Sequence, residues 1–264
     1  MAAAPARHPA EDPADPFSAA LDSRDRDVPR LVREALAHDR ARLALQPVKA
    51  REDGRVVFHE ALIRLTDPSG VILPAAQFVP HVETTLLGRE LDCTGLKLGL
   101  AHLEAHPGAR ISINMSARSI ADGTWRRMLD DWLRTHADDG PRLILEMTEA
   151  SAMLLPEITV RFMAEMQPRG VCFALDDFGS GEIAFRHLKD FFFDLAKIDK
   201  ALAPGIDTDP DNQAIAEALI GVARQFEMFT VAQGVERQGE AELYKGLGVD
   251  CLQGYLIGRP GFRA

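Results

Sequence analysis

Two adjacent carboxylates, Asp176 and Asp177, stand at the point of this sequence best suited to chemistry. They follow the apolar segment 171–175, whose length predicts a buried strand, and they precede a glycine-containing turn. Neighbouring carboxylates at the end of a buried strand repel each other unless a cation or several hydrogen-bond donors balance their charge. A shared divalent metal is one interpretation. A helix cap, or pairing with an Arg or Lys, is the other.

Similar polar residues stand within or directly after other apolar segments: Glu60 and Arg64, Asn114, Glu146 and Glu149, Lys197, Gln233 and Glu236, and Gln253. An all-oxygen donor set with four negative charges can be drawn from them, made of Glu60, Asn114, Glu146, Asp176 and Asp177. Oxygen donors suit Mg²⁺ or Mn²⁺. Two such ions would balance the charges and hold a water in line with a phosphodiester. Lys197 would contact that water or the phosphate, and Arg64 a phosphate oxygen.

Each of these residues also has a purely structural interpretation. Any one carboxylate could cap a helix or accept a salt bridge. Lys197 could pair with Asp176 or Asp177, and Gln253 could satisfy the backbone. The recurrence of polar residues at successive segment ends, while the segment interiors stay apolar, favours a common site.

Eight predicted strands must position these residues, and they alternate mainly with helical patterns. The predicted strands are 43–48, 56–63, 110–114, 142–146, 171–175, 194–198, 229–232 and 251–255. The first two flank the turn 52–54 and predict an antiparallel hairpin. This order predicts an α/β fold, a TIM-like (β/α)8 barrel modified by one antiparallel strand near the N-terminus. Active sites of such barrels lie at the carboxyl ends of the strands.

Composition narrows the function further. The chain has 264 residues, 46% of them hydrophobic, and a net charge of −10 without any run rich in Lys and Arg, which argues against a polymeric nucleic acid as partner. Three cysteines without metal-ligand spacing, and no apolar run of about 20 residues, predict a cytoplasmic protein without a membrane span. Neither an HxH nor an HExxH motif occurs among the eight histidines, which argues against a zinc-protease-like site. Residues 1–25 are predicted to be a disordered leader, and 26–264 a single domain.

Seven short motifs follow one another in order: Gln46-Pro47-Val48, Glu60-Ala61-Leu62-Ile63-Arg64, Ile113-Asn114-Met115-Ser116, Leu145-Glu146-Met147-Thr148-Glu149, Asp176-Asp177-Phe178-Gly179, Lys197-Ile198-Asp199 and Gln253-Gly254-Tyr255. From about residue 42 to about residue 260 the set resembles the EAL domain family. The resemblance implies a modified barrel that hydrolyses the bacterial messenger cyclic di-GMP to linear pGpG. It also implies Mg²⁺ or Mn²⁺ as cofactor, with two ions per site.

The resemblance also implies roles for single residues. One metal would be held by Glu60, Asn114, Glu146 and Asp176, and the second by Asp176 and Asp177. Lys197 would contact the catalytic water. The substrate would be positioned by Gln46, Leu62, Arg64, Glu236 and Gln253. Glu149 would steady the loop after the Asp-Asp pair.

Two departures from the family pattern affect the expected activity. Gln233 stands where the family has a Glu on the side of the second metal and the water, and Gln can neither accept a proton nor supply charge. The loop 180–184 also differs, at Glu182 and Ile183. Two functions follow: a slow phosphodiesterase, or an impaired domain that binds cyclic di-GMP as a receptor. An interaction module that has lost the nucleotide is a third. The run Phe191-Phe192-Phe193 is either a homodimer surface or core packing, and regulation would come through an oligomer, a protein partner or the N-terminal segment.

Overall fold

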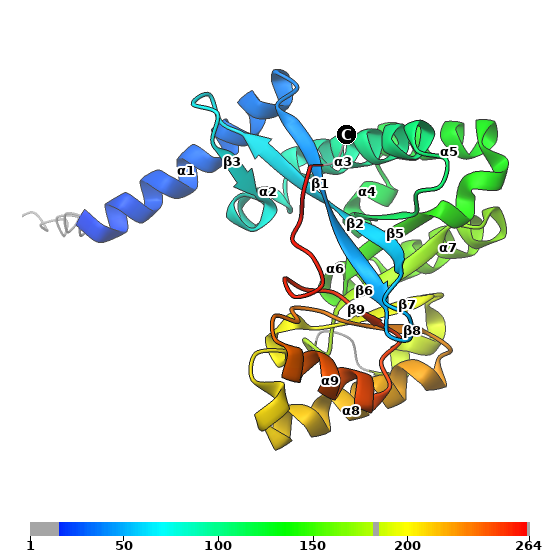
Figure 1. The fold of residues 1–264 in the computed structure, drawn as a ribbon. Coiled ribbons are helices and arrows are strands. Elements are labelled where there is room, and N and C mark those ends of the chain that lie inside the picture. Colours follow the sequence, from blue (N-terminus) through cyan, green and yellow to red (C-terminus); the bar gives the residue numbers. More distant parts are fainter. Residues whose placement is uncertain (1–15, 182–184, 263–264) are drawn as a thin grey trace, which may run out of the picture.

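A closed barrel forms the centre of the protein. The computed structural model describes residues 16–181 and 185–262, and within these residues nine strands form one sheet in the order β1-β9-β8-β7-β6-β5-β4-β2-β3, with β1 also pairing β2 (Figure 1). The strands are β1 Ala41–Ala50, β2 Val56–Thr66, β3 Ile72–Pro74, β4 Ile111–Asn114, β5 Leu143–Thr148, β6 Cys172–Phe178, β7 Leu195–Ile198, β8 Phe229–Ala232 and β9 Cys251–Leu252. The β1–β2 pairing closes a barrel of eight strands, which confirms the predicted fold class.

The N-terminal hairpin supplies the predicted antiparallel strand. β1 runs antiparallel to its two neighbours, β2 and β9. The other neighbouring strands of the barrel, in the order β2, β4, β5, β6, β7, β8 and β9, are all parallel to one another. The turn after β1 contains Gly54 with φ of +68°, a left-handed conformation that Gly adopts without a steric penalty. The register sets Gln46 directly opposite Glu60, so both side chains lie on one face of the sheet.

Helices cover the outside of the barrel. They are α1 Pro16–Ala37, α2 Val79–Val82, α3 Leu86–Ala105, α4 Ala117–Ile120, α5 Gly123–Thr135, α6 Glu149–Leu154, α7 Pro156–Met166, α8 Pro210–Gln225 and α9 Gln238–Leu247. Figure 1 shows α3, α5 and α7 on one side of the barrel and α8 and α9 on the other. Short 3₁₀ turns join them: η1 Ala75–Gln77, η2 Ala137–Arg142, η3 Gln167–Arg169, η4 Phe185–Asp190, η5 Lys200–Leu202 and η6 Ile206–Thr208. Within the described residues, no helix combines the length and apolarity that crossing a bilayer requires.

Several element boundaries differ from the sequence prediction. The first helix, predicted from residue 27, begins at Pro16, so part of the predicted leader is helical; residues 1–15 lie outside the described part of the chain. The helix predicted over 74–82 is divided between η1 and the short α2, and β3 precedes it. The last strand ends at Leu252 because the chain then turns at Gly254, whose missing side chain allows contact with the backbone of Val235.

Strand alternation separates two apolar layers. Outward side chains such as Leu145 and Phe173 pack under the helices, where Phe162 of α7 meets the Phe173 ring edge-on at 5.7 Å and the Trp125 ring at 5.8 Å. A smaller cluster, made of Val48, Phe58, Ile144, Ala174, Val231 and Cys251, comes from the alternate positions and fills the barrel interior. Phe191 and Phe193 are each 7% exposed and belong to the outer core, whereas Phe192 is 43% exposed.

The interior cluster determines where the polar residues lie. Two positions further along each parallel strand, the side chain returns to the same face, so Phe58 is followed by Glu60, Ile144 by Glu146 and Ala174 by Asp176. The same step leads from Leu195 to Lys197, from Val231 to Gln233 and from Cys251 to Gln253. The barrel therefore has an apolar interior layer, and a polar layer directly above it at the carboxyl ends of the strands.

Gly140 offers a test of how the strands are aligned. A Cβ atom there would collide with the backbone carbonyl oxygen of Arg169, so its absence lets η2, which leads into β5, lie against the turn that leads into β6. We expect Gly140→Ala to lower the free energy of unfolding by about 2 kcal/mol or more, because backbone atoms must move apart. Urea denaturation measures this loss.

Gly246→Ala in α9 is the matched control, because a Cβ there would meet no atom within 4 Å. We expect that variant to be neutral or to gain up to about 1 kcal/mol from the helix propensity of Ala. Equal stability of the two variants would contradict the proposed close approach.

Candidate functional site

The polar layer is centred on one buried ammonium group. Nζ of Lys197 on β7 lies 3.0 Å from Oε2 of Glu60 and 3.5 Å from Oδ1 of Asp176, and it donates a short hydrogen bond to Oε1 of Glu146. The side chains of Lys197 and Glu146 are 1% and 0% exposed. Three carboxylates thus share one ammonium, and when all are ionised their charges of −3 and +1 leave −2 in a desolvated space.

Amide side chains complete the surroundings of Glu60. Nδ2 of Asn114 donates to its Oε1 at 3.1 Å, and Nε2 of Gln253 donates to its Oε2 at 2.5 Å. Burial opposes ionisation of Glu60, but the ammonium of Lys197 and these two amides outweigh it and hold the pKa of Glu60 below its usual value. Gln46 accepts a bond from Gln253 at 3.2 Å and donates to the carbonyl of Gly258 at 3.1 Å, which ties β1 and the C-terminal segment to the site.

An irregularity in β6 sets the positions of Asp176 and Asp177. The β6–β7 register shifts between Leu175 and Phe178, and Asp177 has φ of +52°, which is uncommon for a residue with a side chain. Burial raises the pKa of Asp176 to about 7, and the charges of Glu60 and Asp177 add to the shift. Burial also raises the pKa of Asp177, although Lys200 opposes that. Both carboxyls therefore lie where a nearby cation would be strongly favourable.

Gln233 contacts the same carboxylate. Its Nε2 donates a short hydrogen bond to Oδ1 of Asp176 from the end of β8, and Gln233 is 8% exposed. Gln233, which departs from the family pattern, thus lies within the cluster. Its amide donates a hydrogen bond where a Glu would offer an acceptor oxygen.

Glu149 connects the site to the loop that follows β6. The residue is 1% exposed at the start of α6, and its carboxylate accepts from N–H of Gly179 at 3.0 Å and from Oγ–H of Ser180 at 3.3 Å. These bonds join Glu149 to the first residues of the loop. That Glu149 steadies this loop, as the family resemblance implies, stays a prediction. Glu182 and Ile183, where the loop differs from the family, lie outside the described residues.

Three predicted substrate contacts make no contact with the Lys197 cluster that the described residues show. Arg64 on β2 is half-buried, donates to the carbonyl of Ile63 at 3.0 Å, and has its pKa lowered by burial against the opposing charges of Glu60 and Tyr255. Leu62 is half-buried on the same strand. Glu236 is exposed in the loop after β8.

Glu240 is a residue that the sequence prediction missed. It is 2% exposed in the first turn of α9, and its carboxylate accepts from the backbone N–H of Glu236 at 2.9 Å, of Arg237 at 3.0 Å and of Gly205 at 3.2 Å. It therefore fixes the loop that carries Gln233 and Glu236. An acidic residue three positions after the N-cap of a helix is the signal that could have revealed it.

The donor set fits a divalent cation. Oε2 of Glu146 is buried without a hydrogen-bond partner within the described residues, and buried carboxylate oxygens are rarely left without one. Within those residues no three His, Cys, Asp or Glu side chains are arranged to hold a metal ion. Lys197 lies among the carboxylates in this structure. Oxygen donors with excess negative charge match Mg²⁺ or Mn²⁺ in chemistry.

The closed barrel and the acidic layer at its strand ends define a TIM-like barrel protein with its site at the carboxyl ends of the strands. Residues 30–260 match the EAL domain, and the chain belongs to this family.

The chain is 30% identical over 236 residues to the bifunctional diguanylate cyclase/cyclic di-GMP phosphodiesterase MucR of Pseudomonas aeruginosa, a match that spans 87% of this chain and 34% of MucR. It is 30% identical over 239 residues to the cyclic di-GMP phosphodiesterase PdeL of Escherichia coli, over 88% of this chain and 66% of PdeL. Among solved structures, the PaMucR phosphodiesterase in complex with c-di-GMP superposes with a TM-score of 0.77 at 28% identity, over 89% of this chain and 97% of that one.

Lys197 allows the charge balance to be tested. Lys197→Met keeps a side chain of similar length but removes the common partner of three carboxylates, of which Glu60 and Glu146 are buried and Asp176 is half-buried. We expect the free energy of unfolding at pH 7 to fall by about 3–5 kcal/mol, as when one partner of a buried ion pair is removed. Urea denaturation measures the loss. Addition of MgCl₂ should raise the free energy of unfolding more in this variant than in the wild type.

Lys245→Met on the exposed surface of α9 is the control and should change little. If both lysine variants are equally stable, or if Mg²⁺ stabilises Lys197→Met no more than the wild type, then Lys197 does not balance the charge of the carboxylates.

Proposed function

We propose that this protein is a metal-dependent phosphodiesterase that hydrolyses cyclic di-GMP to linear pGpG. The observation that carries the proposal is the cluster of Glu60, Glu146 and Asp176 around Lys197, surrounded by the amides of Asn114, Gln253 and Gln233. Its relatives in the family include named cyclic di-GMP phosphodiesterases, which supports the substrate.

The acidic residues would hold the cofactor. Glu60, Asn114, Glu146 and Asp176 would bind one Mg²⁺ or Mn²⁺, and Asp176 with Asp177 a second. The cations supply charge that offsets the phosphodiester and lowers the pKa of a bound water. Because Asn114 and Gln253 already fix both oxygens of Glu60, this ligand is oriented before the cofactor binds.

The chain's own groups would carry the remaining chemistry. Water oxygen forms the new bond to phosphorus, and the bond from phosphorus to the 3′ oxygen of the neighbouring ribose breaks, which opens the ring. Lys197 would hydrogen-bond the attacking water and stabilise the negative charge that develops on the phosphate. Arg64 would hold a phosphate oxygen of the substrate, with Gln46, Leu62, Glu236 and Gln253 around it.

A second function, reception of cyclic di-GMP without hydrolysis, is favoured by one contact. Gln233 donates to Asp176, so it occupies an oxygen that the second cation would share, and it cannot take a proton from water. A nucleotide could then bind without being cleaved. Homodimer formation and a regulatory protein partner stay predictions.

Gln233→Glu distinguishes these functions. Because the variant restores a proton acceptor beside Asp176, we expect turnover of cyclic di-GMP with Mn²⁺ to rise by about 10²-fold or more. Chromatography of pGpG gives the rate, and calorimetry with Ca²⁺ in place of Mn²⁺ gives the affinity, which we expect to change little.

Gln238→Glu is the control, because it adds the same charge to an exposed residue of the neighbouring helix α9. Turnover by the wild type supports the phosphodiesterase, and binding without turnover supports the receptor. A folded protein that neither binds nor cleaves the nucleotide rules out both functions.

A further inference from the structure

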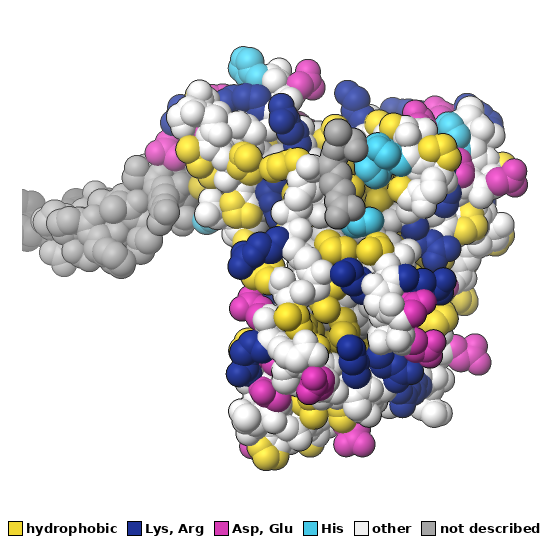
Figure 2. Space-filling model, in the orientation of Figure 1, with side chains coloured by type: hydrophobic (Ala, Val, Ile, Leu, Met, Phe, Trp, Pro, Cys, Tyr) yellow, Lys and Arg dark blue, Asp and Glu magenta, His cyan; other side chains and the backbone are white. Residues whose placement is uncertain are grey.

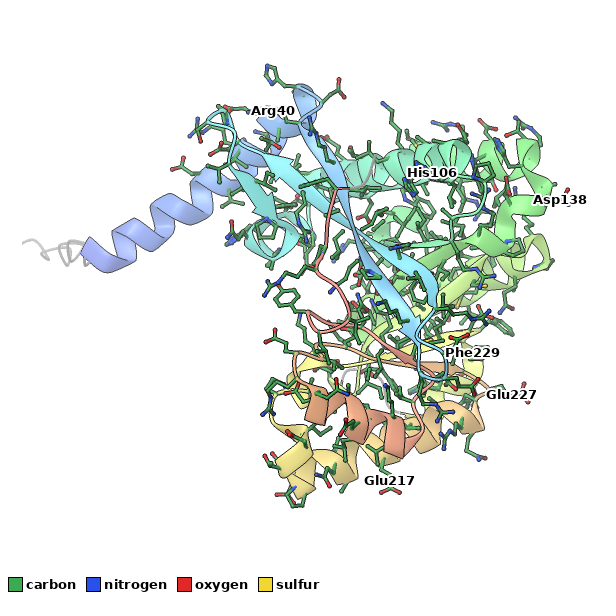
Figure 3. The ribbon with its side chains drawn as sticks, viewed as in Figure 1. Arg40, His106, Asp138, Glu217, Glu227 and Phe229 are labelled. Atoms are coloured by element: carbon green, nitrogen blue, oxygen red, sulfur yellow. The ribbon has the colours of Figure 1, made fainter. Side chains whose placement is uncertain are left out.

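Asp92 is an acidic residue outside the proposed site, and it bonds to the loop that follows β4. It lies in the first half of α3 and is half-buried. Figure 3 shows α3 running along the barrel as far as His106, just beyond its C-terminal end. On the surface seen in Figure 2, Asp and Glu side chains lie among Lys and Arg side chains. Asp92 instead bonds to uncharged donors of the loop between β4 and α4.

One oxygen of Asp92 accepts two hydrogen bonds from this loop. Its Oδ2 accepts from the backbone N–H of Ser116 at 2.8 Å and from Oγ–H of Ser119 at 2.6 Å. The hydroxyl bond has the length typical of an ionised acceptor. Burial raises the pKa of Asp92 to about 6, although both hydrogen bonds oppose the shift. The carboxylate is therefore mainly ionised at pH 7, and in that form it can only accept.

The loop begins at a residue of the proposed site. Asn114 is the last residue of β4, where it is exposed, and its Nδ2 donates to Oε1 of Glu60 at 3.1 Å. The strand ladder holds the backbone of Asn114 only on its N-terminal side, because β4 ends there. The position of the Asn114 amide therefore depends on how the following residues are held.

Three backbone N–H groups in a row hold those residues. They donate at 2.8 Å each to three different elements: Met115 to the carbonyl of Glu146 on β5, Ser116 to Asp92 on α3, and Ala117 to Oγ of Ser151 on α6. Asp92 is the acceptor that also reaches Ser119, so it joins the start of α4 to its last turn. It thereby fixes the loop to a long helix of the barrel's outer layer.

We propose that Asp92 is a positioning residue for Asn114. Through the backbone of the β4–α4 loop, it would hold the Asn114 amide where that amide orients Glu60 and takes part in binding the cation. This inference rests on the proposed function, in which Asn114 and Glu60 are ligands of one metal ion. Groups that hold metal ligands in place commonly change metal affinity by roughly 10- to 100-fold when they are removed.

Mn²⁺ binding tests the proposal. Asp92→Ala removes both hydrogen bonds, and we expect the folded variant to bind Mn²⁺ at least roughly tenfold more weakly than the wild type. Asp92→Asn keeps an acceptor oxygen, so its affinity should lie closer to the wild type than to Asp92→Ala. Electron paramagnetic resonance of the free ion gives the affinities, and circular dichroism with urea denaturation checks folding.

A double-mutant cycle tests whether Asp92 acts through Asn114. Asn114→Ala alone should weaken Mn²⁺ binding. Adding Asp92→Ala to that variant should change the affinity by less than about twofold, because the group that Asp92 positions is already absent. Losses that add in full in the double variant would place the effect of Asp92 elsewhere and would overturn the proposal.

Asp122→Ala is the matched control. Asp122 also accepts two bonds at the start of a helix, from the backbone N–H groups of Thr124 at 2.9 Å and Trp125 at 3.1 Å in α5. We expect this variant to lose stability but to keep its affinity for Mn²⁺. Equal weakening in Asp122→Ala and Asp92→Ala, or equal weakening in Asp92→Asn and Asp92→Ala, would also overturn the proposal.

The same titration separates this inference from the proposed function. Weaker Mn²⁺ binding by Asn114→Ala, together with unchanged binding by Asp92→Ala, would overturn the role of Asp92 and leave the proposed function intact. Absence of Mn²⁺ binding by the wild type would contradict the proposed function itself, and this inference with it.

Discussion

The attraction between the buried ammonium of Lys197 and three carboxylates, two of them buried and one half-buried, is the interaction on which the polar layer of the barrel depends. Lys197 contacts Glu60, Glu146 and Asp176, which arrive on three different strands. Without that charge the carboxylates would repel one another in a space that excludes water, and each would have to be protonated or lose its position. The ammonium only partly balances them. The arrangement that holds the site together therefore leaves it with excess negative charge, which the proposed divalent cation would balance.

The barrel produces this arrangement because side chains alternate between its inner and outer faces along each strand. Side chains that face the interior recur every two residues, so one apolar layer closes the lower part of the barrel and the next inward positions form the polar layer. The apolar layer excludes water from below, and the loops fix the polar layer from above. Glu149 holds the loop after β6, and Glu240 holds the loop after β8, each through backbone N–H groups.

Much of this could be predicted from the sequence, because its causes are local or periodic. Apolar segments separated by helical patterns indicated the barrel, and polar residues at their ends indicated the polar layer, since parallel strands bring their carboxyl ends together. Other features depend on tertiary contacts that no local pattern encodes. The left-handed φ of Asp177 and the position of Lys197 among three carboxylates rather than beside Asp177 are of this kind. Helix ends shifted because capping and packing, rather than periodicity, decide them.

In the proposed function, Gln233 would limit the rate of hydrolysis, and Glu146 would decide whether the site binds a metal. Glu146 is fully buried, contacts Lys197 and retains one oxygen without a hydrogen-bond partner within the described residues. The most direct measurement is a Mn²⁺ titration followed by electron paramagnetic resonance of the free ion, with the wild type and Glu146→Gln. We predict saturable Mn²⁺ binding by the wild type and at least roughly tenfold weaker binding by the folded variant. Absence of binding by the wild type, or equal affinity in the two proteins, would contradict the central claim.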